Sequence, residues 1–338
     1  MSHLASPVEP IRVGNTPIQG KVLLAPMSGV TDAPFRRLAH ALGAPLVVTE
    51  MIASDALARE RPDMVRRAEG SDIRPFVVQL AGREARWMGE GARIATDFGA
   101  DIVDINMGCP AKQVTKGLSG SALMRDLDHA LTLIEATVAA TDRPVTLKMR
   151  MGWDERNLNA PELARRAEAA GVRMITVHGR TRCQLFNGRA DWAFIARVKA
   201  AVAVPVIANG DIVSLDDIQA VLTASKADGI MIGRGAFGRP WLPGRAAQYL
   251  ATGRDPGDPS IERRKVIALS HYDAMLSHYG IELGTRTARK HLGWYVEQAA
   301  AGPADVKRWR ERLCRQDDPA VVRRGLSDFY DMQMELAA

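Results

Sequence analysis

Cys109 occupies the setting in this chain that most strongly suggests chemistry. It stands in "DIVDINMGCPAKQVTKG" (residues 101–117), between a glycine and a proline and directly after an apolar run. Gly108 permits a sharp exit from a strand because glycine tolerates unusual dihedral angles. Pro110 restricts the residue before it to extended conformations. The sequence therefore predicts that Cys109 is held in a defined pose at a strand end.

Further polar side chains stand at the ends of other β-rich runs. They bring acid–base, cationic and amide groups together, but they lack the HxH spacing and clustered acids of a zinc or magnesium site. We therefore expect no metal, and we assign no metal role to Cys109, His178 and Cys183. The set comprises Gln79, Asn106, Lys148, Arg150, His178, Arg180, Asn209, Asp211 and Arg234.

Two glycine turns late in the pattern predict a phosphate site. They are "IANGDI" (207–212) and "IGRG" (232–235). In barrel proteins the loops after the seventh and eighth strands often bind phosphate at a helix N-terminus. Amides at Gly210 and Gly233 would donate to its oxygens, and Arg234 would add a fixed charge, although glycines at such turns also occur for steric reasons alone.

Three further side chains extend this phosphate site into a cofactor site. Lys148 and His178 could reach an electron-rich ring, while Gln79 offers donors and an acceptor to the edge of that ring. A phosphate tail joined to such a ring indicates flavin mononucleotide, FMN.

Eight β-rich runs alternate with amphipathic segments and must position these groups. Buried parallel strands read as near-continuous apolar runs, and the intervening helices carry one apolar stripe, as in 160–171 and 214–226. Eight such units predict a closed (β/α)8 TIM barrel; the first run is not followed by the GxGxxG turn of a dinucleotide-binding sheet. The runs are 21–27, 45–51, 75–82, 101–108, 144–152, 173–179, 204–210 and 227–235.

The composition changes after the eighth run. "TGRDPGDPS" (252–260) is typical of a linker, and 261–336 shows helical periodicity without a strand signal. We therefore predict a barrel domain over residues 1–250 and an α-helical domain over 260–338.

The composition is that of an ordinary globular protein, with 46% hydrophobic and 25% charged residues. Three scattered cysteines are too few for a disulfide framework and favour a reducing compartment. The start "MSHLASPVEP" does not resemble a signal peptide, and no apolar run reaches the ~18 residues of a membrane span. We expect a cytoplasmic monomer; the net charge of +6 permits an anionic partner.

With these residues in view, the chain resembles the tRNA-dihydrouridine synthases, and within them the bacterial B-type branch. The resemblance implies an FMN-bearing barrel with a C-terminal helical bundle that reduces uridines in tRNA using NADPH. Ser119 in "KGLSGSALM" (116–124) departs from the paired glycines usual in the family. The matching motifs are "APMSGVTDAPFR" (25–36), "QLAG" (79–82), "DINMGCPAKQVTKG" (104–117), "LKMRMGW" (147–153), "HGRTRCQ" (178–184), "NGDI" (209–212), "IGRGAFGRPW" (232–241) and "RKHLGWY" (289–295).

The resemblance also implies roles for individual residues. Cys109 matches the catalytic cysteine of the family, which would give a proton to carbon 5 of uracil while the reduced flavin gives a hydride to carbon 6. An unperturbed thiol suits this role because it is mostly protonated near neutral pH. The implied cofactor-binding residues are Pro26, Met27, Ser28, Gln79, Lys148, His178, Asn209, Gly210, Asp211, Gly233 and Arg234.

Binding of tRNA would require cationic side chains around the barrel mouth and on the helical domain. Residues 286–315 contain eight Lys or Arg against three Asp or Glu, although such a run is most often a solvated helix face. Arg286, Arg289 and Lys290 share one helical face by their spacing. The candidate substrate and RNA contacts are Asn106, Lys112, Lys116, Arg180, Arg182, Arg286, Arg289 and Lys290.

Three other functions fit parts of the pattern. A flavin enzyme acting on a free pyrimidine would share the barrel and the acid–base residue, but it does not need the basic helical appendage. A Schiff-base lyase would use Lys148 as its nucleophile. A non-catalytic RNA-binding protein could keep the barrel alone. The sequence does not identify the uridine that would be reduced, and it carries no fingerprint that separates NADPH from NADH.

Overall fold

The computed structural model describes residues 9–337 and contains a closed parallel barrel. Residues 1–8, which include most of the N-terminal stretch compared with a signal peptide, and residue 338 lie outside the described part. The nine-stranded sheet runs in the order β4-β3-β11-β10-β9-β8-β7-β6-β5. Its strands are β3 (Val22–Leu24), β4 (Leu46–Val47), β5 (Ile52–Ala53), β6 (Val77–Ala81), β7 (Ile102–Met107), β8 (Val145–Arg150), β9 (Met174–His178), β10 (Val206–Asn209) and β11 (Gly229–Ile232).

The barrel closes where the second predicted run (45–51), which contains β4, leads directly into β5. A parallel bridge joins Val48 to Val77, and the Thr49 amide donates to the Val77 carbonyl at 3.1 Å. The Thr49 hydroxyl then accepts from the backbone amide of Gln79 at 2.9 Å, so a side chain replaces one backbone hydrogen bond of the ladder. The run is therefore one bent strand of the barrel. All eight predicted strands are confirmed.

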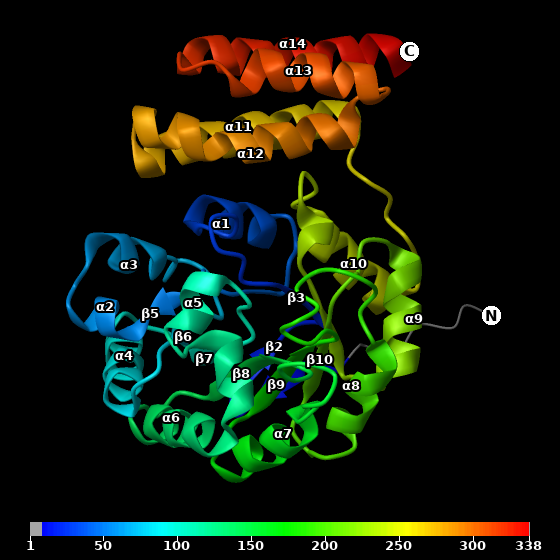
Figure 1. Ribbon diagram of the computed structural model, residues 1–338. Coiled ribbons are helices and arrows are strands. Elements are labelled where there is room, and N and C mark those ends of the chain that lie inside the picture. Colours follow the sequence, from blue (N-terminus) through cyan, green and yellow to red (C-terminus); the bar gives the residue numbers. More distant parts are fainter. Residues whose placement is uncertain (1–8, 338) are drawn as a thin grey trace.

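Helices surround this barrel, as the alternating pattern predicted (Figure 1). Both amphipathic segments named above are helical, as α7 and α9. The barrel helices are α1 (Ala33–Ala41), α2 (Ser54–Ala58), α3 (Pro62–Arg67), α4 (Ala85–Asp97), α5 (Lys112–Lys116), α6 (Leu127–Ala139), α7 (Ala160–Ala169), α8 (Trp192–Lys199), α9 (Leu215–Ser225) and α10 (Leu242–Thr252), with 3-10 turns η1 (Gly120–Arg125) and η2 (Arg234–Ala236).

A β-hairpin that the sequence analysis did not predict covers the N-terminal end of the barrel. Strands β1 (Ile11–Val13) and β2 (Thr16–Ile18) pair antiparallel. Their buried side chains join one apolar cluster with residues such as Val77, Ile102 and Met174, which lie at the first positions of barrel strands. The base of the barrel is therefore apolar.

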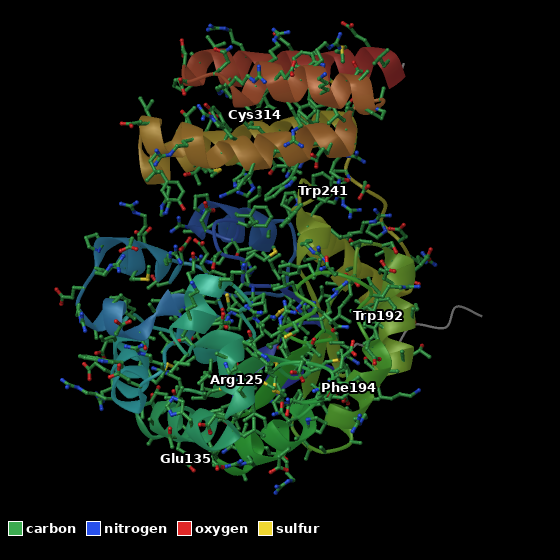
Figure 2. All side chains as sticks on the ribbon, in the orientation of Figure 1. Arg125, Glu135, Trp192, Phe194, Trp241 and Cys314 are labelled. Carbon is green, nitrogen blue, oxygen red and sulfur yellow. The ribbon has the colours of Figure 1, made fainter. Side chains whose placement is uncertain are left out.

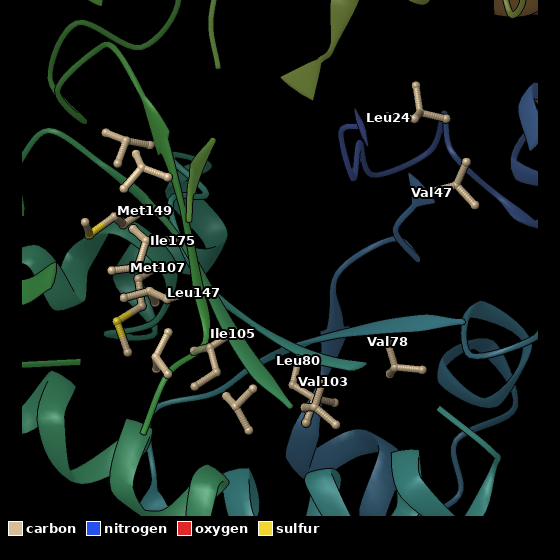
Figure 3. Packing of buried hydrophobic residues seen from close by; sticks show 14 of the residues in the cluster. Leu24, Val47, Val78, Leu80, Val103, Ile105, Met107, Leu147, Met149 and Ile175 are labelled. Carbon is tan, nitrogen blue, oxygen red and sulfur yellow. The ribbon is translucent and has the colours of Figure 1, made fainter. Parts of the chain in front are cut away.

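A larger apolar core fills the space between the strands and the surrounding helices. Figure 3 shows part of this cluster, in which residues at alternate strand positions, such as Val103 and Ile105, point the same way. Side chains on a strand alternate between its two faces. Outward positions are thus apolar, which leaves the intervening positions of the same strands free to carry polar groups into the barrel.

The remaining helices form two layers on one side of the barrel, beyond α1 and α10 (Figure 1). The inner pair lies next to α1 and the outer pair lies beyond it, and the part of the chain after residue 260 is helical as predicted. These helices are α11 (Ile261–Tyr279), α12 (Ile281–Ala299), α13 (Pro303–Cys314) and α14 (Pro319–Ala337).

Aromatic and polar contacts join the helical layers to the barrel. Phe237 stacks on Trp294 of α12 with ring centroids 3.9 Å apart. Tyr279 of α11 donates to Asp32, the N-cap residue of α1, at 3.0 Å. Trp241, labelled at the junction in Figure 2, is buried within the apolar cluster of the helical layers. The orientation of these helices against the barrel is therefore fixed by packed side chains.

Among the described residues, no helix combines the length and the apolar character needed to cross a membrane.

Candidate active site

The main cavity of about 810 Å³ opens at the C-terminal ends of the barrel strands. Cys109, Asn106, Lys112 and Arg182 line this cavity together with every residue that was predicted to bind the cofactor. The latter are Pro26, Met27, Ser28, Gln79, Lys148, His178, Asn209, Gly210, Asp211, Gly233 and Arg234.

Strand register explains why polar groups so far apart in sequence meet here. Asn106 pairs in register with Lys148, and Arg150 with His178, which in turn pairs with Asn209. Residues paired in a parallel ladder point to the same side of the sheet, so each of these polar side chains lies beside a polar side chain of the neighbouring strand inside the barrel. The cavity floor is consequently a continuous polar arc above the apolar base.

The backbone of Cys109 is held from both sides. The Asn106 Oδ1 atom accepts from the Cys109 amide at 3.0 Å and from the Gly108 amide at 3.2 Å. The Cys109 carbonyl accepts from the Ser121 amide at 3.1 Å and its hydroxyl at 2.8 Å. A Cβ on Gly120, whose φ is +59°, would lie 2.9 Å from that carbonyl. The defined pose predicted for this cysteine is therefore supplied by a hydrogen-bonded turn.

Arg150 supports the same turn from the neighbouring strand. Its side chain is buried, and Nε donates to the Gly108 carbonyl at 2.9 Å. Nη1 donates at 2.8 Å to the carbonyls of Thr181 and Leu185. One guanidinium thus ties the Cys109 turn to the loop after β9, and its planar set of donors suits three carbonyls at once.

A chain of hydrogen bonds orients Gln79 toward the cavity. Asn106 Nδ2 donates to Gln79 Oε1 at 2.8 Å, and Gln79 Nε2 donates to Asp104 Oδ2 at 2.6 Å. The other Asp104 oxygen accepts from the Thr146 hydroxyl at 2.5 Å. Burial raises the pKa of Asp104, and the two donors oppose that rise. Sequence reasoning assigned no role to Asp104, whose carboxylate fixes the amide orientation above it.

Lys148 lies buried beside this network. Its Nζ donates to Asn209 Oδ1 at 3.2 Å, and Asn209 Nδ2 donates to the Met231 carbonyl at 2.8 Å. Burial, together with the neighbouring Arg150 guanidinium, lowers the pKa of Lys148 to about 8. The amine still carries its charge at pH 7, which gives the cavity a cation suited to an electron-rich or anionic ligand atom.

His178 is uncharged in this setting. Burial and the nearby charges of Arg150 and Lys148 lower the pKa of His178 well below its ordinary value. Arg180 Nη1 lies 3.4 Å from His178 Nε2, and because arginine only donates, that ring nitrogen acts as the acceptor. The proton of the neutral imidazole is then on Nδ1.

Arg180 is not a rim contact, contrary to our expectation that it would meet RNA. Its side chain is 1% exposed and donates to both oxygens of Asp211 at 2.6 and 2.9 Å. Burial alone would raise the pKa of Asp211, but hydrogen bonds from Arg180 and the Ala190 amide hold it below its ordinary value. Asp211 also pairs with Arg234 at 3.3 Å. Arg180 therefore positions the charged rim instead of forming it.

Gly210 has a steric reason to be glycine. Its φ is +119°, and a Cβ there would lie 2.8 Å from the Ala190 side chain and 2.9 Å from the His178 ring. The turn after β10 therefore passes close to the imidazole, which brings Gly210 to the cavity wall.

The other predicted RNA contacts occupy several positions. Lys112 and Lys116 are exposed on α5, but only Lys112 lines the cavity. Arg182 Cζ lies 4.8 Å from the Trp153 ring centroid. On α12, Arg286 is exposed and Arg289 pairs with Asp317 at 2.5 Å.

Lys290 is half-buried and is turned toward the barrel. A Cβ on Gly29 would lie 3.3 Å from its Nζ. Burial lowers the pKa of Lys290, and the carboxylates of Asp32 and Glu50 oppose that shift. The three cations on α12 therefore do not form one free basic surface, although their spacing predicted a shared face.

Phe186 is the cavity residue that sequence reasoning missed most clearly. It is 51% exposed, and the Arg234 and Arg150 Cζ atoms lie 4.9 and 5.4 Å from its ring centroid. It belongs to an irregular loop without strand or helix periodicity, so the sequence carried no signal for its position. For Asp104 a signal existed, since polar residues at alternate positions of a buried strand must face inward.

Within residues 9–337 no group of three or more His, Cys, Asp or Glu side chains is placed to hold a metal ion.

Comparison with known proteins points to one family. The profile of the family described as dihydrouridine synthase (Dus) matches residues 23–330. A protein of Rhizobium leguminosarum bv. phaseoli named probable tRNA-dihydrouridine synthase is 55% identical over 86% of this chain and 90% of its own length. The tRNA-dihydrouridine synthase B of Pseudomonas putida is 43% identical over 91% and 90%, respectively.

Solved structures share the fold at low identity. The 2-naphthoyl-CoA reductase matches with a TM-score of 0.60 at 12% identity, over 97% of this chain and 69% of its own. Histamine dehydrogenase from Rhizobium sp. 4-9 matches with a TM-score of 0.57 at 14% identity, over 79% of this chain and 50% of its own. These likenesses show the barrel fold, whereas the profile and the close relatives extend over nearly the whole sequence: the chain belongs to the dihydrouridine synthase family of oxidoreductases.

Proposed function

We propose that this protein reduces uridine in tRNA to 5,6-dihydrouridine, with FMN in the main cavity, NADPH as the reductant and Cys109 as the proton donor. The observation that carries the proposal is the placement of the Cys109 turn in the same cavity as every residue predicted to bind the flavin.

The cavity fits FMN in size and in its donor set. Its volume of about 810 Å³ lies within the ~300–1,000 Å³ range typical of pockets for cofactor-sized ligands. Lys148, Gln79 and the neutral His178 would meet the ring system, while Arg234 at the rim would meet the phosphate. Pro26 and Met27 would cover an apolar part of the ring. When bound, the flavin supplies a hydride.

The chain itself handles the proton. Hydride addition at carbon 6 of uracil leaves negative charge that a proton on carbon 5 must neutralise. The Cys109 thiol gives up that proton as the new C–H bond forms, and the resulting thiolate regains one from solvent. Asn106 and Ser121 keep the turn in place during both steps, because they hold the amide and the carbonyl of this residue. General acids of this kind typically contribute about 10²–10⁴-fold.

Access to the cavity requires the uridine to leave its stack, which costs a few kcal/mol and least in an unpaired loop. Contacts with the rest of the RNA would offset this cost. Lys112, Lys116 and Arg286 are the exposed candidates, and Arg182 lies at the cavity wall. If they bind phosphates, affinity for tRNA falls steeply with salt.

The test compares two single cysteine variants. Cys109→Ala should remain yellow and be reduced by NADPH, but its dihydrouridine formation should fall by about 10²–10⁴-fold. Cys183→Ala is the matched control, since Cys183 is exposed and does not line the cavity; its activity should remain unchanged. Full activity of Cys109→Ala, or colourless wild-type protein, would refute the proposal.

A further inference from the structure

A second cavity of about 360 Å³ adjoins the main one and has no role in the chemistry described so far. It lies at the C-terminal ends of β5 and β6. Met51 lines both cavities, and Lys112 of the first is followed in sequence by Gln113 of the second. A single ligand could therefore extend from one cavity into the other without a long linking segment.

Cationic groups outnumber anionic ones in this second cavity. Its charged lining residues are Arg59, Arg67 and Arg83 against Asp55 and Glu84. Arg83 pairs with Glu84 at 3.5 Å, and both side chains are more than half exposed. Such an exposed pair is weak, so it can reorganise around a ligand. The excess of arginines favours an anion.

Arg59 contacts an aromatic ring, and no carboxylate of the described residues neutralises its charge. Its Cζ lies 5.7 Å from the centroid of the Trp87 ring, and it has no carboxylate partner within residues 9–337. At this distance the guanidinium makes a cation–π contact with the indole. The N–H groups at its edge stay available for charge-assisted hydrogen bonds to phosphate oxygens.

Two further features point to a polar ligand in the same place. Arg67 donates from Nη1 to the Met51 carbonyl at 3.1 Å, which directs its guanidinium along the border with the main cavity. Ser54 lines the second cavity, and its hydroxyl is buried with no hydrogen-bond partner in the described part of the chain. Buried polar groups normally find a partner.

We propose that the second cavity binds the adenosine 2′-phosphate end of the reductant, which makes the enzyme prefer NADPH to NADH. This rests on the proposed function, since the nicotinamide end must reach the main cavity. Arginine side chains near the ribose accept a 2′-phosphate, whereas the 2′-hydroxyl of NADH is usually met by a carboxylate. A concave cavity of this size suits one phosphorylated nucleoside, while RNA backbone contacts need only an open surface.

The direct test measures binding of 2′,5′-ADP and of 5′-AMP by calorimetry. Wild-type protein should bind 2′,5′-ADP more tightly than 5′-AMP. Arg59→Gln and Arg67→Gln should each weaken 2′,5′-ADP binding by about 10-fold or more, as expected for loss of a charge-assisted contact. Arg61→Gln is the control, because Arg61 pairs with Asp63 and lines neither cavity. Arg59→Lys should retain part of the affinity if charge is what matters.

Stopped-flow measurements of flavin reduction and reoxidation then distinguish a defect in the 2′-phosphate site from a defect in the other steps of the reaction. In the same variants the apparent Kd for NADPH in flavin reduction should rise about 10-fold, while that for NADH and the rate of flavin reoxidation by tRNA stay unchanged. An equal rise in the apparent Kd for NADPH and for NADH, or unaltered 2′,5′-ADP binding, would overturn the proposal. Weaker tRNA binding with unchanged NADPH kinetics would assign the cavity to RNA instead. If wild-type protein forms no dihydrouridine at all, the proposed function fails, whereas the nucleotide-binding result still decides the site.

Discussion

Lys148→Met should make the cofactor-free protein more stable while removing its ability to hold the flavin. The Lys148 side chain is buried, and its pKa falls from 10.5 to about 8. A difference of this size corresponds to about 3 kcal/mol of unfavourable charge burial at neutral pH. Methionine fills a similar volume without a charge, so this penalty disappears in the variant.

Two losses reduce the gain from this substitution. Asn209 Oδ1 loses its donor at 3.2 Å, which costs about 1 kcal/mol. Asp104 loses a favourable charge interaction, because Lys148 opposes the rise in the pKa of that carboxyl. We therefore expect a net increase of about 1–2 kcal/mol in the free energy of unfolding at pH 7.

The pH dependence follows from the direction of the shift. Below pH 8 both folded and unfolded Lys148 are protonated, so wild-type protein bears the full penalty. Between about pH 8 and 10.5 the folded state binds fewer protons than the unfolded state, and wild-type stability rises with pH. The advantage of Lys148→Met should consequently be complete at pH 7 and largely gone by pH 10.5.

Urea unfolding of the cofactor-free proteins, with flavin binding followed by fluorescence quenching, provides the measurement. Lys307→Met is the matched control, because Lys307 is exposed on α13; it should change neither stability nor flavin binding. The reasoning would be refuted if Lys148→Met were less stable than wild type at pH 7. It would also be refuted if the variant exceeded wild type in the free energy of unfolding by the same amount at pH 7 and at pH 10.5. So would undiminished FMN affinity.

Three further substitutions test the supports of the site. Asn106→Ala removes the acceptor for the Gly108 and Cys109 amides and the donor to Gln79; dihydrouridine formation should fall about 10-fold or more in single-turnover assays, and by a larger factor than flavin reduction by NADPH. Gly210→Ala forces a side chain into a positive-φ turn against His178 and should cost about 1–3 kcal/mol, with weaker FMN binding by fluorescence titration. Tyr279→Phe removes the hydrogen bond to Asp32 and should cost about 1–2 kcal/mol in thermal unfolding, and an unchanged Tm would show that this contact does not hold the helical layers on the barrel.

The fold and most of the site could be predicted from local pattern. Strands buried on both faces must be apolar, so eight apolar runs separated by amphipathic segments identified the barrel. Inside such a barrel the C-terminal ends of the strands converge, which is why residues as distant as Gln79 and Arg234 could be assigned to one cavity. The hairpin β1–β2 escaped prediction because three-residue strands give too little periodicity to recognise.

The partners of the charged side chains could not be predicted from the sequence. Arg180 looked like a rim cation, but its charge is neutralised by Asp211, which lies 31 residues away in sequence. Lys290 looked like part of a basic helix face, yet the docking of α12 turns it toward Gly29. Charge and periodicity are properties of the chain, whereas exposure and pairing depend on which elements pack together. The sequence by itself thus determined the barrel, the cysteine turn and the polar groups at the strand ends that line the cavity; only the tertiary structure decided which charges stay free to meet a ligand, because that depends on contacts between segments far apart in the chain.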